Sequence, residues 1–180
     1  HALIASKGEW VNLLQLLQEE LPHEQLVEAL GSTGVLQASI AIKEKVVAQD
    51  PHETGLRKIL NFGHTVGHAI ESAALEHNAL PHGYCVLWGM VAEVYLSVVK
   101  LGCPREVLQQ LTQIMLQYYG RPQCNCKQRE QLIQRMYQDK KNSANRTPNF
   151  TLLRAVGEPE INQYVSEKDI DEALEYLFSL

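Results

Sequence analysis

The sequence has no surplus of positive charge, no long uninterrupted apolar run and few cysteines. Its 180 residues include 16 lysines and arginines against 21 aspartates and glutamates, which gives a net charge of −5. The chain therefore lacks the basic surplus that attracts nucleic acid or anionic lipid. The longest apolar run, Cys85 to Leu101, is interrupted by Glu93 and is too short and too polar to span a bilayer. We expect neither a nucleic-acid partner nor a membrane partner.

The few cysteines do not form a recognisable metal or redox motif. They stand at positions 85, 103, 124 and 126, and the close pair Cys124 and Cys126 is too tightly spaced for a typical zinc knuckle. Reduced thiols of this kind are typical of the cytoplasm. No signal peptide is visible at the start of the chain. A cytoplasmic location is expected.

The composition is that of an ordinary globular domain. Hydrophobic residues make up 45% of the chain and charged residues 21%, which is enough for a sizeable core. No internal repeat or low-complexity segment divides the sequence, so we expect a single domain over residues 1–180. The first residues, His1 to Lys7, contain no initiator methionine and read as the continuation of a helix. We expect the chain to be part of a larger protein.

Helical periodicity dominates the sequence. It predicts helices over residues 10–21, 24–30, 34–50, 53–60, 64–76, 84–101, 105–119 and 127–140. The helix over 84–101 is apolar nearly all round and should be the buried centre of a bundle. In the 34–50 helix the expected apolar face consists of Val35, Leu36, Ile40, Val46 and Val47.

The last part of the chain has a different pattern. Residues 149–156 have strand composition, and a turn at 157–159 predicts a short hairpin with residues 160–165. Ser166 to Asp169 resembles a capping box that opens a last helix. The predicted fold is mostly α, with a short β-hairpin near the C-terminus.

Three histidines gather in the middle of the sequence. His64 and His68 are four residues apart in a predicted helix, so both imidazoles should project from one face. His82 stands in a predicted loop before the long apolar helix. Each histidine alone could be an ordinary surface or loop residue. The three together, with Arg57 and Asn61 upstream, predict a site, because imidazole is a common metal ligand and titrates near pH 7.

Two kinds of metal site can be compared for these histidines. The spacing of His64 and His68 is that of the zinc proteases, but Thr65 stands where their catalytic glutamate is needed. In the second arrangement His64 and His82 hold a divalent metal. A catalytic zinc typically takes three protein ligands, so one more ligand must come from elsewhere. His68 would then be available for proton transfer.

Donor groups for anions accompany the histidines. They are Lys43, Arg57, Asn61 and the adjacent pair Lys140 and Lys141. Such side chains suit carboxylate and phosphate groups. Metal, base and anion-binding groups together indicate a small, acidic, phosphorylated substrate.

Several segments resemble the C-terminal domain of the 3-dehydroquinate synthase family. They read KEKVVAQDPHETGLRKILNFGHTVGHAIE, LPHG followed by GM, MYQDKKN and LLRAVG. The block from GLR to HAIE is the most specific, and the resemblance extends over essentially the whole chain. It implies an N-terminal NAD-binding α/β domain, a helical C-terminal domain and an active site between them.

The resemblance also implies an activity in the shikimate pathway of aromatic amino acid biosynthesis. The enzyme would use NAD and a divalent metal, zinc or cobalt. It would convert 3-deoxy-D-arabino-heptulosonate 7-phosphate, a sugar-acid phosphate, to 3-dehydroquinate and phosphate. A homodimer of the full-length protein is expected, and no residue of this chain is assigned to NAD.

By the same resemblance, His64 and His82 are metal ligands. His68 would contact the reacting hydroxyl and the phosphate, and Glu53 would belong to the same proton-relay network. Substrate binding would fall to a second set of residues. The carboxylate would be held by Lys43 and Arg57, and the phosphate by Asn61 and either Lys140 or Lys141.

Two departures from the family pattern stand out. After the second metal histidine the family usually reads HGEA, whereas Tyr84 and Cys85 stand here in place of Glu and Ala. A glutamate ligand and an active-site lysine of the family lie just before the position of His1. We therefore expect the 180-residue chain alone to be inactive and to bind metal weakly or not at all.

Three other functions remain open. A metal-dependent polyol dehydrogenase of the glycerol type would share the two-domain fold but would not need Lys43 and Arg57 as anion-binding groups. Another sugar-phosphate cyclase, such as a 2-deoxy-scyllo-inosose synthase, would not need a carboxylate site. The third is a helical interaction module whose histidines are structural.

Overall fold

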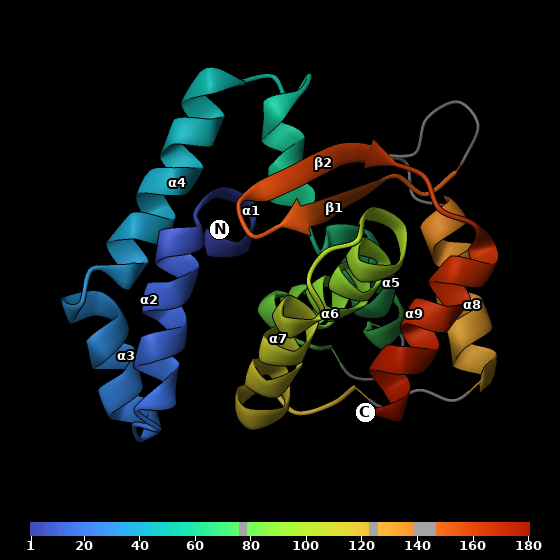
Figure 1. The fold of residues 1–180 in the computed structure, drawn as a ribbon. Coiled ribbons are helices and arrows are strands. Elements are labelled where there is room, and N and C mark those ends of the chain that lie inside the picture. Colours follow the sequence, from blue (N-terminus) through green and yellow to red (C-terminus); the bar gives the residue numbers. More distant parts are fainter. Residues whose placement is uncertain (76–78, 123–125, 139–146) are drawn as a thin grey trace.

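The computed structural model describes residues 1–75, 79–122, 126–138 and 147–180. These residues form nine α-helices, one 3₁₀ helix and one two-stranded antiparallel sheet (Figure 1). The helices are α1 (Ala2–Ala5), α2 (Lys7–Gln18), α3 (His23–Ser32), α4 (Val35–Gln49), η1 (Leu56–Asn61), α5 (His64–Ala74), α6 (His82–Leu101), α7 (Arg105–Tyr118), α8 (Cys126–Gln138) and α9 (Glu167–Ser179). The strands are β1 (Phe150–Ala155) and β2 (Glu158–Gln163). The mostly α fold with a hairpin near the C-terminus is confirmed.

Helix α6 is the centre of the molecule. It packs against α5, α7, α9 and β1, and Val91, Val94 and Leu96 on it are fully buried. The prediction of a buried central helix is therefore confirmed. The expectation that this run is too short and too polar to span a bilayer is wrong by length and composition alone: the helix has 20 residues, and an 18-residue window of it has a mean hydropathy of 1.5. Half of that apolar window is buried inside the fold, and a core helix passes the same test.

Helices α2, α3 and α4 lie to one side of this centre (Figure 1). They are connected to the rest of the fold by hydrogen bonds, such as that from Trp10 Nε1 to Gln110 Oε1 of α7 at 3.0 Å. The apolar face predicted for residues 34–50 is wrong in part. Val46 is buried, but Leu36 and Ile40 are about half exposed.

The hairpin covers one end of the helices (Figure 1). Phe150, Leu152 and Leu153 of β1 are fully buried, which explains why this strand is apolar. The backbone N–H of Leu153 donates to Ser97 Oγ of α6 at 2.9 Å. Strand β2 begins at Glu158, two residues before the predicted start, because the turn is confined to Val156 and Gly157.

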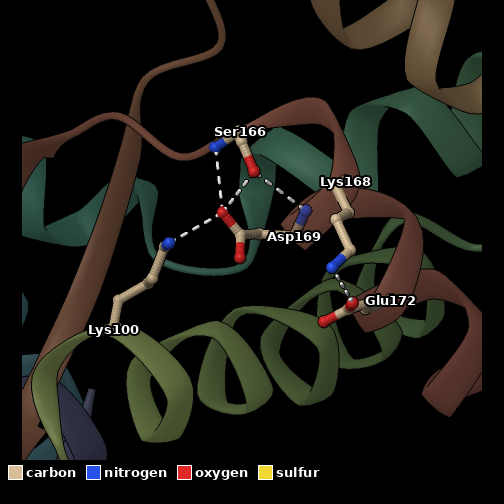
Figure 2. A network of polar contacts seen from close by, with 5 residues as sticks. All are labelled: Lys100, Ser166, Lys168, Asp169 and Glu172. Atoms are coloured by element: carbon tan, nitrogen blue, oxygen red, sulfur yellow. Dashed lines mark hydrogen bonds and ion pairs between the residues drawn. The ribbon is translucent and has the colours of Figure 1, made fainter.

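The last helix is fixed to α6 by a polar network (Figure 2). Ser166 and Asp169 form the predicted capping box, in which each side chain accepts from the other residue's backbone N–H. Lys100, in the last turn of α6, lies 2.7 Å from Asp169 Oδ2. A second pair, Lys168 and Glu172, is separated by 3.5 Å within α9. The capping residue therefore also joins two helices.

Candidate metal centre

Three imidazoles meet where α5 and α6 begin. His64 and His68 come from successive turns of α5, and His82 is the first residue of α6. The ring centroids are 5.2 Å apart for His64 and His68, 5.5 Å for His64 and His82, and 5.8 Å for His68 and His82. One ligand nitrogen from each ring lies within 4.8 Å of the others. The predicted gathering of the three histidines is confirmed, but His82 is a helix residue rather than a loop residue.

A carboxylate holds the His82 ring. Glu71 Oε2, in the last part of α5, lies 3.0 Å from His82 Nδ1. An ionised carboxylate only accepts hydrogen bonds, so the proton of His82 belongs on Nδ1 and the lone pair on Nε2. A carboxylate in this position orients a metal-binding histidine and raises its basicity. Glu71 was not among the site residues predicted from the sequence. Its spacing of seven residues from His64 was the available signal.

The His64 ring is held by the backbone. Its Nδ1 lies 3.1 Å from the carbonyl oxygen of Phe62. A carbonyl can only accept, so His64 also carries its proton on Nδ1 and directs the Nε2 lone pair away from this contact. The protonation of both rings therefore fits metal binding through Nε2.

Glycines bring α5 and α6 together. A Cβ on Gly63 would lie 2.3 Å from Met90 Cγ, and one on Gly67 would lie 3.0 Å from the carbonyl oxygen of Cys85. Gly89 faces the same contact from the α6 side. Gly63 also has φ +82°, a conformation that L side chains rarely adopt. The distance between His64 and His82 thus depends on the close approach of α5 and α6, which only glycine permits at these positions.

A buried carboxylate caps the start of α5. Glu93 of α6 is fully buried and accepts the backbone N–H groups of Gly63 at 2.7 Å, Thr65 at 3.2 Å and Val66 at 3.4 Å. Burial raises the pKa of Glu93 to about 8, while the three N–H groups oppose this increase. In the sequence, Glu93 stands out only as an interruption of an apolar run.

The segment before α5 is organised by Asp50. Its carboxylate accepts the backbone N–H groups of Thr54 at 3.0 Å, Gly55 at 2.8 Å and Arg57 at 3.0 Å. These bonds, that from Arg57 first, hold the pKa of Asp50 well below its usual range. The helix predicted for residues 53–60 is replaced by this turn and by η1.

Two of the predicted proton-relay and substrate residues lie together in that segment. Asn61 Nδ2 donates to Glu53 Oε1 at 2.6 Å, and Glu53 has φ +56°. Arg57 Nη1 donates to the carbonyl oxygen of Pro51 at 2.8 Å. Asn61 is the last residue of η1 and lies three residues before His64. The η1 helix therefore connects the Glu53–Asn61 pair to the histidine cluster.

Of the predicted lysines, the structure describes only Lys43, and it is not brought into this arrangement. Lys43 is exposed on α4. Among the described residues, no hydrogen bond or ion pair joins Lys43 to the other candidates. Lys140 and Lys141 lie outside the residues that the structure describes.

Tyr84, one of the departures from the family pattern, faces an apolar cavity. The cavity has a volume of about 540 Å³ and lies between α2, α3, α6 and α7. The Tyr84 ring contacts Tyr119 at a centroid distance of 4.9 Å and Trp88 at 6.0 Å. Cys85 is fully buried. Among the residues lining this cavity, none belongs to the histidine cluster.

Comparison with known sequences identifies one family. A sequence model described as "3-dehydroquinate synthase C-terminal" matches residues 1–142. A 3-dehydroquinate synthase of Parabacteroides distasonis is 37% identical over 177 residues, which are 98% of this chain and 48% of that protein. One of Methylacidiphilum infernorum is 38% identical over 139 residues, 76% of this chain and 38% of that protein. The chain spans about half the length, or less, of these curated relatives.

Comparison with solved structures supports the same fold. A 2-epi-5-epi-valiolone synthase from Streptomyces hygroscopicus, with NAD+ and Zn2+ bound, has a TM-score of 0.76 at 21% identity, covering 99% of this chain and 48% of that one. A 2-deoxy-scyllo-inosose synthase complexed with carbaglucose-6-phosphate, NAD+ and Co2+ has a TM-score of 0.66 at 20% identity, covering 85% and 41%. At these identities the likeness concerns the fold alone.

Proposed function

The chain belongs to the 3-dehydroquinate synthase family, as its C-terminal domain, and we propose that it forms the metal- and substrate-binding half of an enzyme that converts 3-deoxy-D-arabino-heptulosonate 7-phosphate to 3-dehydroquinate and phosphate. One observation carries this proposal. His64 and His82 face each other across α5 and α6 with both Nδ1 atoms held by acceptors. Such a pair suits a divalent metal, which relatives of this fold bind as Zn2+ or Co2+.

The donor set fits zinc or cobalt. Imidazole nitrogen is a usual ligand of both metals. We assign His64 and His82 as ligands and a third ligand to the rest of the full-length protein. When bound, the metal polarises a substrate oxygen and NAD takes and returns a hydride.

The residues of this chain supply proton transfer. His68 lies one turn from His64 and would move a proton between the reacting hydroxyl and the phosphate. Glu53 would accept or return protons in the same network. The amide of Asn61 donates to Glu53 and so fixes the carboxylate in one orientation.

Cationic side chains would hold the substrate. One N–H group of Arg57 donates to the carbonyl oxygen of Pro51. The remaining N–H donors of its planar guanidinium group suit a carboxylate. Lys43 is assigned to the same carboxylate. Asn61 and one of Lys140 or Lys141 are assigned to the phosphate. Holding both ends of the substrate restricts its conformation, which lowers the entropic part of the barrier.

For the full-length protein we propose an N-terminal NAD-binding domain, a homodimer and a place in the shikimate pathway of the cytoplasm. These assignments follow from the family resemblance. The half-length coverage of the curated relatives supports the additional domain.

A second candidate is another sugar-phosphate cyclase. A 2-epi-5-epi-valiolone synthase shares the fold at 21% identity, and the metal-binding histidine pair suits this class of enzyme equally well. Such an enzyme would act on a sugar phosphate without a carboxylate. Arg57 and Lys43 favour the first candidate, because both are suited to that carboxylate.

The deciding experiment is phosphate release by the full-length protein with the heptulosonate phosphate, NAD and zinc, with and without a chelator. The proposal predicts release that needs both metal and catalytic NAD. His64→Ala should abolish release with little change in melting temperature. Release only from a sugar phosphate without a carboxylate would establish the second candidate. No release from either substrate by a folded, metal-loaded protein would overturn the proposed function.

A further inference from the structure

The peptide group between Phe62 and Gly63 connects a buried acid to a candidate metal ligand. Its N–H donates to Glu93 Oε2 at 2.7 Å. Its carbonyl oxygen lies 3.1 Å from His64 Nδ1. One peptide plane therefore has a carboxylate at one end and an imidazole at the other.

This connection fixes the orientation of the peptide. Gly63 has φ +82°, and rotation of the peptide would break both hydrogen bonds at once. Glu93 also accepts from Thr65 and Val66, the next donors of the first turn of α5. The carboxylate thus holds the turn on both sides of His64.

The surroundings make the contact strong. Glu93 is fully buried and its two carboxyl oxygens accept three backbone N–H groups, and a hydrogen bond in a low-dielectric interior is stronger than one at the surface. Bonds in a chain also polarise one another, so an acceptor on the N–H side makes the carbonyl a better acceptor for the imidazole N–H. A more basic imidazole binds a metal more tightly.

Helix α6 carries both Glu93 and His82. The acid therefore holds the α5 end of the histidine pair from the same rigid element that presents the other histidine. With the glycine contact between α5 and α6, this sets how His64 faces His82.

We propose that Glu93 is a positioning residue for the metal site: through the Phe62–Gly63 peptide it fixes the tautomer and direction of the His64 ring. The inference rests on the proposed function, because it concerns His64 as a ligand. Glu93 itself does not contact the metal or the substrate in this role.

The test compares two buried substitutions on α6 in the full-length protein. Glu93→Gln keeps the shape but places an amide NH₂ against backbone donors. Ser97→Ala is the matched control. Ser97 lies one turn further on, is fully buried and also accepts a backbone N–H, that of Leu153, while its hydroxyl donates to the backbone carbonyl oxygen of Glu93 at 2.6 Å. Among the hydrogen bonds of the described residues, none joins the Ser97 side chain to α5. Co2+ affinity is measured by competition with a chromophoric chelator, and the visible absorption of the bound cobalt is recorded.

The expected result distinguishes an effect on the position of the His64 ring from an effect on the stability of the fold. Both variants should lower the melting temperature. Only Glu93→Gln should weaken Co2+ binding, by about 10- to 100-fold, and alter the cobalt spectrum. Equal affinities and spectra for wild type, Glu93→Gln and Ser97→Ala would overturn the inference while leaving the proposed function intact. A wild-type protein that binds no Co2+ would overturn the inference and the proposed metal site together.

A second variant covers the case in which Glu93→Gln loses the fold by circular dichroism. Glu93→Asp keeps the carboxyl group and shortens the side chain by one methylene, so it reaches the three N–H groups less well. The Co2+ affinity and spectrum of Glu93→Asp are then compared with those of Ser97→Ala. Unchanged Co2+ affinity in Glu93→Asp would count against the inference, and a loss confined to that variant would support it.

Discussion

Gly89 of α6 lies directly against Gly63 at the start of α5: a Cβ on Gly89 would lie 2.0 Å from the carbonyl oxygen of Gly63. No side chain can move aside there, because the clash is with backbone. The distance between the two helices, and so between His64 and His82, depends on this contact.

Gly89→Ala should therefore destabilise the protein by about 3 kcal/mol or more, since overpacking against a rigid backbone forces the helices apart. Denaturant unfolding followed by circular dichroism measures the change. Gly83→Ala is the control, because a Cβ at Gly83, also in α6, would meet nothing within 4 Å. It should change stability by less than about 1 kcal/mol, in the stabilising direction. Similar effects of the two substitutions would refute the backbone contact.

Glu71→Gln should lower the affinity of the full-length protein for zinc by about tenfold. The amide would no longer present a charged acceptor to His82 Nδ1, so the ring would lose its preferred tautomer. The contact is partly exposed, with 30% of the Glu71 side chain accessible, which keeps the effect at the lower end. Calorimetric titration with zinc measures it, and Glu175→Gln on the exposed face of α9 serves as control. Equal affinities in the two variants would show that Glu71 does not orient His82.

Asp169 should make stability dependent on acid pH. Its pKa is held below the usual value by the hydrogen bond from Lys100 and then by Ser166. An acid whose pKa is lower in the folded state contributes stability above its unfolded pKa of about 3.9 and loses it as pH falls through the folded value. Asp169→Asn should thus cost at most about 1 kcal/mol at pH 7.

The difference between wild type and Asp169→Asn should shrink below about pH 4. Thermal unfolding from pH 7 to pH 2.5 tests this. Glu172→Gln, which breaks the exposed pair with Lys168 (Figure 2), should have almost no effect at neutral pH. A difference for Asp169→Asn that is the same at every pH would contradict the assignment.

Asp50→Asn should impair substrate binding more than metal binding. Asp50 holds the turn that carries Glu53 and leads to Arg57, and the amide would replace an acceptor with a donor. KM for the heptulosonate phosphate should rise by about tenfold or more, while zinc affinity stays within twofold or so. Asp171→Asn, whose carboxylate instead pairs with Arg129, is the control. If the fold-decrease in zinc affinity exceeded the fold-increase in KM, the turn would support the histidines rather than the substrate.

The sequence predicted the parts of the site that obey local rules. The four-residue spacing of His64 and His68 places two rings on one helix face wherever that helix lies. The capping box at Ser166 and Asp169 was predictable for the same reason. His82 was expected in the loop before the long apolar helix, whereas α6 begins at His82 directly after Pro81, a position where proline is well tolerated.

The missed residues act over long distances along the chain. Glu93 accepts the N–H of Gly63, 30 residues earlier in the chain, and a carboxyl group in an apolar run gives no sign of which backbone it accepts from. Leu36 and Ile40 have the spacing of a buried helical face, yet both are about half exposed. Periodicity shows which residues share a face, but it does not show whether another element covers that face. The roles of Lys43, Lys140 and Lys141 remain predictions.

The closeness of α5 and α6 in the sequence has a consequence for the order of folding. Only residues 75–81 separate the two helices that carry the histidines, so the entropy lost in closing that loop is small. The hairpin and α9, by contrast, pack on α6 from more than 45 residues further along the chain. The helix pair with its three histidines can therefore assemble as an early folding unit, and Gly89→Ala should slow refolding as well as lower stability.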